Sequence, residues 1–357
     1  MRLFYLQAIV ILMILFSGCL QNNKISTGDG KRVRQLVDTV GFAQYPWQMN
    51  AFMDRLDESD WKDERKYSWR LAICPHDDYT YVGSVYPRIL SKVTAPRIIL
   101  IGVAHRAAQM KTEDRLVFDT YTHWKGPWSD VPVSPARDGI YDLLKNDFAI
   151  INDTLSGVEH SLEALIPFLQ YFNRNVEIIP VLVPAMRPAR MNECGKALAE
   201  AIQKVTGKLG WEWGDDYAVI VTTDAVHYGN EDWGGADRAY FRCDDFGNNR
   251  AIRYEHEIMN DCLLGEVVPE KIEKFSIYTL NPENFREYKW TWCGRYSVPL
   301  GMYTGFYLNN SEPMEGEFIS YSTSITRFHI PVDDLAMGRT AIATRCHWVG
   351  YAAIGYK

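Results

Sequence analysis

Three short apolar runs in this 357-residue chain each end at polar side chains that can bind a metal or carry a proton. His76 follows the first run and His105 the second, while Asp224 and His227 follow the third. In an open α/β sheet, ligands bind beyond the carboxyl ends of the strands, where side chains from several strands converge. We therefore expect one polar pocket with the donor types of a metal site. The runs are residues 71–74, 98–103 and 217–222.

The third run is followed by a pair suited to acid–base chemistry. Asp224 and His227 are three residues apart, so one helical turn would place both side chains on the same side. The carboxylate can then fix the tautomer of the imidazole and raise its basicity. The alternative is a surface pair that caps a helix. His160 is a further candidate proton carrier, because it lies just outside a predicted helix and has no evident structural task.

Two carboxylates and a tyrosine directly follow His76. A ligating imidazole usually donates its other N–H to a carboxylate, so Asp77 or Asp78 would orient His76. The alternative is that both acids shape a turn. Tyr79 is a further candidate neighbour of the pocket.

A cysteine between bulky aromatic residues is the last candidate. Such a cysteine is ordinarily a buried hydrophobe. Cys293, however, is followed by Gly294 and Arg295, which favours a turn close to polar chemistry. Arg295 could stabilise an anion or a thiolate there.

The elements that must position these residues alternate between strand and helix. A fourth buried strand is predicted at residues 178–183, and three consecutive strands at 318–322, 341–343 and 347–356. This order predicts an α/β fold, a single-domain open mixed sheet with helices on both faces. In the helix over 161–172, Ser161 is expected as N-cap and Glu163 in a capping box. The predicted helices are 46–56, 84–90, 135–145, 161–172, 190–205 and 249–264.

Composition excludes some functions. The net charge is −7, and no cluster of Lys and Arg could follow a phosphate backbone, so we expect no nucleic-acid partner. Aromatic residues make up 13% of the chain, which favours a core rich in Tyr and Trp over a sugar-stacking surface.

The N-terminus has the pattern of a targeting signal. Arg2 precedes an almost wholly apolar stretch from Leu3 to Phe16, which is too short for a transmembrane span of ~20 residues. Small residues before Cys19 resemble the lipobox of bacterial lipoproteins, in which the cysteine is lipidated. We therefore expect a signal peptide over 1–18, a tether over 19–32 and an exported, membrane-anchored domain over 33–357. The alternative is a signal anchor with a chance cysteine.

Export would allow disulfides among the other six cysteines. Their spacing is irregular and no pairing can be deduced from it. The six are Cys74, Cys194, Cys243, Cys262, Cys293 and Cys346.

Taken together, these residues resemble the Memo family, the protein B component of the AmmeMemoRadiSam system, whose fold is related to class III extradiol dioxygenases. Seven short stretches of this chain match family stretches in the same order. They are residues 75–81 (Pro-His-Ala-Gly-Tyr-x-Tyr in the family), 102–105 (Gly-Pro-Ser-His), 159–163 (Glu-His-Ser-Ile-Glu), 179–183 (Ile-Pro-Val-Leu-Val), 223–227 (Ser-Asp-x-x-His), 293–295 (Cys-Gly-Arg) and 350–354 (Ser-Tyr-Ala-Ala-Gly). Two departures stand out. Asp77-Asp78 replaces Ala-Gly, and Val103-Ala104 replaces Pro-Ser.

The resemblance implies a metal site of His76, His105 and Cys293, with Asp224, His227 and His160 lining the same pocket. It favours a metal-dependent redox enzyme with Fe²⁺ or Cu, acting on a small molecule, in which His227 or His160 moves a proton and Asp224 orients it. A thiolate in place of a carboxylate argues against extradiol ring cleavage itself. One alternative is a zinc metallohydrolase, because two imidazoles, a thiolate and water also suit zinc. Another is a lipoprotein that binds a metal or small ligand without turnover.

Overall fold

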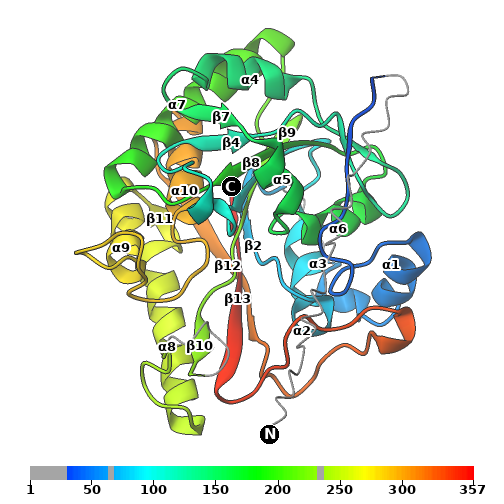
Figure 1. Ribbon diagram of the computed structural model, residues 1–357, viewed down its shortest axis with the longest axis vertical. Coiled ribbons are helices and arrows are strands. Elements are labelled where there is room, and N and C mark those ends of the chain that lie inside the picture. Colours follow the sequence, from blue (N-terminus) through cyan, green and yellow to red (C-terminus); the bar gives the residue numbers. More distant parts are fainter. Residues whose placement is uncertain (1–29, 63–67, 231–236) are drawn as a thin grey trace, which may run out of the picture.

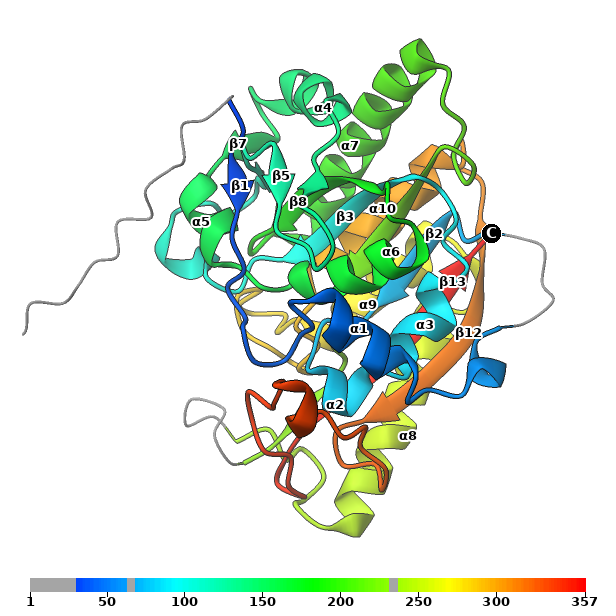
Figure 2. The same cartoon turned by 90° about the vertical axis from the view of Figure 1, so that its right-hand side faces the viewer.

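The computed structural model describes residues 30–62, 68–230 and 237–357, which fold around one large mixed sheet (Figures 1 and 2). The strand order is β11-β12-β13-β2-β9-β3-β8-β4-β7, and β10 pairs with β13 outside this path. The predicted α/β fold with an open mixed sheet is thus confirmed. The strands are β2 (Leu71–Cys74), β3 (Arg97–Val103), β4 (Leu116–Phe118), β7 (Ala149–Ile151), β8 (Glu177–Val183), β9 (Tyr217–Thr222), β10 (His227–Gly229), β11 (Gly265–Val267), β12 (Met314–Thr323) and β13 (His347–Tyr356). A small second sheet contains β1 (Val33–Arg34), β5 (His123–Trp124) and β6 (Val131–Pro132).

The centre of the large sheet is parallel and buried on both faces. Strands β2, β9, β3 and β8 run side by side in the same direction. Successive side chains point to opposite faces, so Leu71 and Ile73 enter one core and Ala72 and Cys74 enter the other. This double burial explains why the strands read as unbroken apolar runs. It also brings the carboxyl ends of these strands to one edge.

Helices cover each face of the sheet (Figures 1 and 2). One core contains side chains of α4 (Ala136–Leu144), α7 (Pro188–Leu209), α8 (Asp245–Cys262), α9 (Pro269–Thr279) and α10 (Ser297–Leu308). The other contains side chains of α1 (Pro46–Met53), α2 (Tyr79–Val82), α3 (Val85–Leu90), α5 (Asp153–Val158) and α6 (Ile166–Phe172).

The sequence does not predict helix α10, which follows the Cys293 turn. Nearly every residue of α10 is buried, so the helix lacks the polar stripe that would mark its period. Two glycines let it pack closely on the sheet. A Cβ atom on Gly301 would lie 2.3 Å from Val221 Cγ2, and one on Gly305 would lie 2.6 Å from Leu71 Cδ1.

Two local predictions are wrong. Residues 341–343 are not a strand, because the Tyr81 hydroxyl donates to the Ala341 carbonyl and accepts from the Ala343 N–H. The helix expected from 161 starts at Ile166, after a 3₁₀ turn over Glu163–Leu165.

Ser161 and Glu163 therefore do not cap that helix. The Ser161 hydroxyl donates to the Val103 carbonyl, 2.7 Å away. Glu163 is buried in an ion pair with Arg34, and its carboxylate also accepts the backbone N–H of Val37 at 2.7 Å. Both side chains fix distant segments instead of a helix end.

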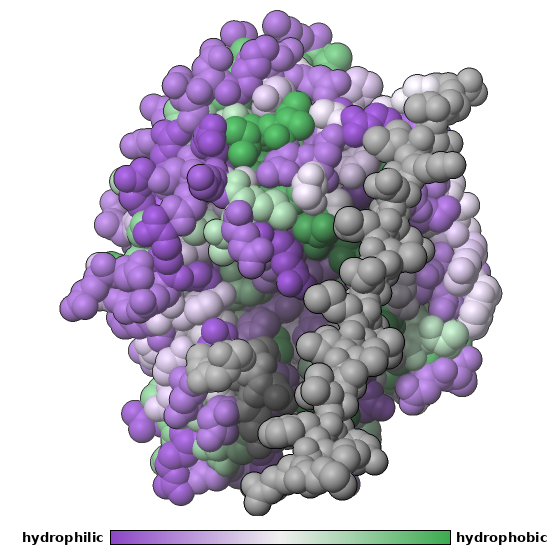
Figure 3. All heavy atoms as spheres, viewed as in Figure 1, coloured by the Kyte–Doolittle hydropathy of each residue, from purple (hydrophilic) through white to green (hydrophobic). Residues whose placement is uncertain are grey.

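The predicted signal peptide, Cys19 and most of the predicted tether lie outside the described residues. Within the described part of the chain, no helix is both long and apolar enough to cross a bilayer. The surface seen in Figure 3 is mostly hydrophilic, with apolar side chains gathered in small patches.

Candidate metal centre

Three neighbouring strand ends carry the first group of site residues. Strand β9 lies between β2 and β3, in parallel with both. The chain leaves β2 at Cys74 and reaches His76 two residues later, and it reaches His105 two residues after β3. Asp224 comes two residues after β9. The same short distance from each strand end places the three side chains at one edge of the sheet.

Cys293 reaches this edge through strand-like pairing between two loops. Val226 and Trp292 form an antiparallel bridge, and the His227 N–H donates to the Thr291 carbonyl at 3.1 Å. The next residue, Gly294, packs directly on Thr223. A Cβ atom there would lie 2.3 Å from Thr223 Oγ1, so only glycine fits this turn.

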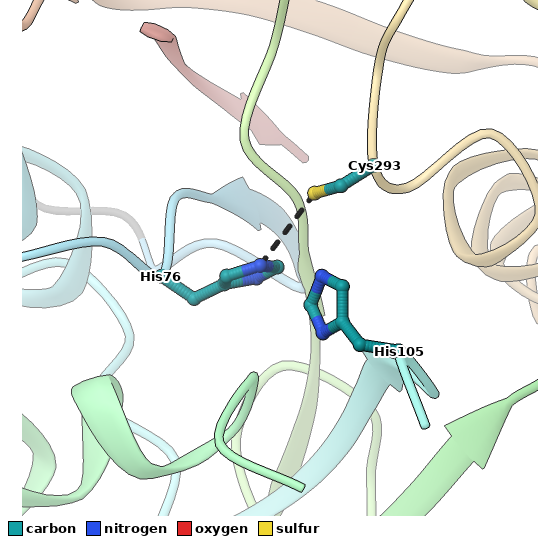
Figure 4. Close-up of side chains that lie close together, drawn as sticks. All are labelled: His76, His105 and Cys293. Carbon is teal, nitrogen blue, oxygen red and sulfur yellow. Dashed lines mark hydrogen bonds between the residues drawn. The ribbon is translucent and has the colours of Figure 1, made fainter. Parts of the chain in front are cut away.

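His76, His105 and Cys293 point toward one another (Figure 4). One ligand atom of each lies within 4.8 Å of the other two, and Cys293 Sγ lies 3.5 Å from His76 Nε2. Metal bonds of about 2.0–2.3 Å place the ligands of one ion about 3–4 Å apart. Small side-chain adjustments would therefore let this group hold a metal ion.

Glu159 holds His105 in its orientation. The His105 Nδ1 atom lies 2.8 Å from Glu159 Oε1, and the His105 backbone N–H donates to Oε2 at 2.6 Å. The same carboxylate accepts the backbone N–H groups of His160 and Ser161. Burial alone would raise its pKa, but the His105 and His160 charges and these hydrogen bonds lower the pKa of Glu159 to about 2.

The sequence alone does not predict this role of Glu159. The available signal is its position directly before His160, in the stretch that matches Glu-His-Ser-Ile-Glu of the family. Nothing local in that stretch indicates that its partner would be His105, which is 54 residues earlier in the chain.

Asp224 contacts two of the three candidate ligands. Its Oδ1 atom accepts the His76 backbone N–H at 3.0 Å, and Oδ2 lies 3.5 Å from His76 Nε2. Its own backbone N–H donates to Cys293 Sγ at 3.1 Å. Burial raises the pKa of the Asp224 carboxyl to about 7.

The helical turn expected between Asp224 and His227 is absent from this described segment, because His227 begins strand β10. The backbone bonds instead to β13, since Ala225 N–H donates to the Gly350 carbonyl and Gly350 N–H to the Val226 carbonyl. Asp224 and His227 still face the same space, where they form a ligand group with Cys293 within 4.8 Å.

Burial favours the neutral form of three imidazoles of the site, those of His76, His160 and His227. It lowers the pKa of His76 well below the usual range, and the charges of His105, His160 and His227 add to this effect. Burial and the His105 charge lower the pKa of His160 to about 4 and that of His227 to about 3. Neutral imidazoles have a free lone pair for a metal or a proton.

The Cys293 thiol is protonated unless a cation is present. Burial raises its pKa well above the usual range, and the Asp224 charge raises it further. The Asp224 N–H and the Thr223 hydroxyl, 3.7 Å away, favour the thiolate. A bound metal deprotonates a coordinating thiol.

Most of these side chains, though not those of Cys293 and Glu159, line a cavity of about 1190 Å³. Five of the eight histidines in the chain lie in its wall, together with the carboxylates of Asp38, Asp77, Asp78 and Asp224. Residues 340–344 form part of the wall. The five histidines are His76, His105, His160, His227 and His347.

A family model described as Memo-like protein matches residues 42–330, which include the candidate ligands His76, His105 and Cys293 and the neighbouring His160, Asp224 and His227. The chain belongs to the Memo-like family. Three relatives are MEMO1 family proteins. That of Methanothermobacter thermautotrophicus is 29% identical over 172 residues (45% of this chain, 55% of the relative). That of Aquifex aeolicus is 24% identical over 186 residues (51% and 62%), and that of Thermotoga maritima 28% identical over 145 residues (39% and 46%). The chain spans about half the length of these curated relatives.

In this Memo-like protein, Asp77 and Asp78 bond to residues other than His76. Asp77 Oδ2 accepts the Tyr351 hydroxyl at 2.6 Å, and Asp78 Oδ2 accepts the Thr340 N–H at 2.6 Å. Burial raises the pKa of both carboxyl groups. The two acids therefore attach the C-terminal segment to the pocket.

Tyr79 and Arg295 lie away from the proposed ligand atoms. The Tyr79 hydroxyl donates to the Ala164 carbonyl at 2.7 Å, and its ring packs against Phe52. The Arg295 guanidinium lies over the Tyr288 ring, 3.6 Å from its centroid, and donates to a backbone carbonyl. Arg295 influences the Cys293 thiol only through its charge, which favours the thiolate.

Two of the cysteines whose pairing cannot be deduced from the sequence form a disulfide in this Memo-like protein. Cys243, just before α8, is bonded to Cys346, just before β13. Cys74, Cys194, Cys262 and Cys293 are free and buried. The bond attaches the segment beside the cavity to helix α8.

Proposed function

We propose that the protein binds iron or copper, iron(II) foremost, through His76, His105 and Cys293, and that it oxidises a small molecule in the adjoining cavity. The observation that carries this proposal is the convergence of two imidazoles and a thiol from three distant segments, with ligand atoms within 4.8 Å. The cavity beside them is large enough for a small-molecule ligand.

The donor set fits such a metal. Imidazole and thiolate ligands suit iron, copper and zinc, and three protein ligands leave a coordination position for a further group. Bound there, iron or copper would supply redox chemistry.

The residues around the ligands would prepare the site for reaction. Glu159 fixes the orientation of the His105 ring, while Asp224 binds the His76 backbone N–H through its carboxylate and Cys293 Sγ through its own backbone N–H. His160 and His227 line the cavity as neutral imidazoles, so either could accept a proton from a bound substrate.

The test is metal analysis after anaerobic purification, followed by oxygen uptake with catechols and other candidate reductants. Iron or copper with substrate-dependent uptake would support the proposal. Zinc without uptake would favour hydrolysis, and a tightly bound metal without turnover would favour a binding protein. Protein that binds no metal would refute the site.

We also propose that the domain is exported and anchored by lipid at Cys19. The lipobox-like sequence before Cys19 supports this location. The Cys243–Cys346 disulfide supports it independently, because disulfides persist in oxidising compartments and are rare in the cytosol.

A further inference from the structure

Glu255, in the middle of α8, is a fully buried carboxylate that the site described above does not include. Among the described residues, no Lys, Arg or His forms an ion pair with it. Burying a carboxylate without a cation is costly unless hydrogen bonds replace its lost hydration. The donors that satisfy Glu255 therefore indicate why the acid is there.

Three N–H groups donate to Glu255, and all come from segments next to site residues. Its Oε1 atom accepts the indole N–H of Trp292 at 2.8 Å and that of Trp290. Its Oε2 atom accepts the backbone N–H of Val226 at 3.0 Å. Trp292 directly precedes Cys293, and Val226 lies between Asp224 and His227.

One carboxylate thus joins the two loops that meet at the metal site. Burial raises the pKa of Glu255 to about 7, while the hydrogen bonds from Trp290, Trp292 and Val226 lower it. Gly350 of β13 lies against this arrangement, because a Cβ atom there would lie 2.6 Å from the Tyr321 hydroxyl and 3.2 Å from Glu255 Oε2. A larger residue at position 350 would therefore crowd both side chains.

We propose that Glu255 is a positioning residue of the metal centre, holding the Cys293 segment against the segment from Asp224 to His227. This inference rests on the metal site proposed above. A carboxylate suits this task because its two oxygens only accept hydrogen bonds, and together they can accept those of all three N–H groups. Glutamine has nearly the same shape, but its amide nitrogen would face a donor. Glu255→Gln should therefore displace one loop without leaving a cavity.

The experiment titrates cobalt(II) alone into metal-free wild type, Glu255→Gln and a matched control. Thiolate coordination gives a charge-transfer absorption band that depends on the position of Cys293 Sγ. The control is Asp119→Asn, which removes a buried carboxylate that bonds an indole, that of Trp124, and pairs with Arg137. Asp119 does not line the cavity.

We expect Glu255→Gln to weaken cobalt binding at least ~10-fold, the effect typical of losing a group that orients a ligand, and to shift the thiolate band. Asp119→Asn should keep wild-type affinity and band even where it lowers the melting temperature. Circular dichroism establishes that each variant is folded before titration. If Glu255→Gln does not fold, Trp292→Phe, which removes one donor and keeps the acid, is measured in its place.

The possible results distinguish a failure of the positioning role from a failure of the proposed metal site on which it rests. Wild type without a thiolate band would overturn both. A wild-type band that Glu255→Gln, or Trp292→Phe in its place, leaves unchanged would overturn the positioning role alone. An equal loss in Asp119→Asn would also overturn it, since the effect would then follow from any buried carboxylate.

Discussion

His105 Nδ1 lies 2.8 Å from Glu159 Oε1, which leaves the other ring nitrogen directed toward His76 and Cys293 (Figure 4). A carboxylate on the far side of an imidazole fixes its tautomer and raises its basicity as a ligand. Glu159 also accepts the backbone N–H groups of His105 and His160. The orientation of His105 is therefore set before any metal arrives.

Glu159→Gln should weaken metal binding about 10–100-fold, because the amide holds His105 less firmly and stabilises the wrong tautomer. The measurement is a dissociation constant by competition with a metal chelator. Asp119→Asn serves as the control for loss of a buried carboxylate. Unchanged affinity in Glu159→Gln would show that His105 does not bind the metal through this arrangement.

Cys293→Ser and His76→Ala should each reduce bound metal to a small fraction of wild type, because each removes one of three proposed ligands. Metal content after anaerobic purification is the measurement. Cys194→Ser alters another buried free cysteine, which belongs to none of the candidate ligand groups of the described residues, and this variant should keep its metal. Full occupancy in both ligand variants would rule out the site.

The contribution of Glu255 to the stability of the metal-free protein should fall as the pH rises toward 7, while the buried histidines with lowered pKa values contribute in the opposite direction. Burial raises its pKa from 4.5 to about 7 in the folded state. Between these values only the folded state holds the proton, so each pH unit upward costs about 1.4 kcal/mol for this group at most. At pH values above the pKa of Glu255 in the folded state, this loss of stability is complete. At pH values below its pKa in the unfolded state, Glu255 causes no loss.

Urea unfolding of metal-free wild type and Glu255→Gln checks this sign from about pH 5 to about pH 8. The variant lacks the titrating proton, so the free energy of unfolding of wild type should fall relative to that of the variant as the pH rises over that range. Parallel curves would mean that Glu255 does not change its charge within this range.

Thiol titration in denaturant tests the cysteine pairing. In a Cys19→Ser background, four thiols should react without reductant, namely Cys74, Cys194, Cys262 and Cys293. Reduction should release two further thiols, those of Cys243 and Cys346. It should also lower the free energy of unfolding by about 2–5 kcal/mol, as for other native disulfides. Six reactive thiols before reduction would contradict the bond.

Cys19→Ser should move the protein from the membrane fraction to the soluble fraction of the cell, because it removes the proposed site of lipid attachment. Cys194→Ser, which leaves the signal sequence intact, should stay with the membranes. Retention of Cys19→Ser in the membrane fraction would contradict the lipoprotein assignment.

The central strands and their polar ends could be predicted because a strand that is buried on both faces is a continuous apolar run in the sequence. Leu71–Cys74 and Tyr217–Thr222 are strands over the predicted residues. The same burial hides α10, since a helix that is apolar on all sides has no distinguishing period.

The wrong or missing site predictions concern partners that are distant in sequence. The backbone of Ala225 bonds to Gly350, which replaces the expected helical turn. Glu163 pairs with Arg34, which replaces the expected capping box. Local spacing contains no information about such contacts, so Glu159 and Glu255 could be recognised only in three dimensions.

Strand β13, which includes the last residues of the chain except Lys357, lies between β12 and β2 in the interior of the sheet. Its residues Ile354 and Tyr356 pair with Ile73 and Leu71 of β2. The strand that leads into the His76 loop is thus held on one side by a segment from the opposite end of the described chain. Any change that weakens this pairing should disturb the position of His76, although β13 lies far from His76 in sequence.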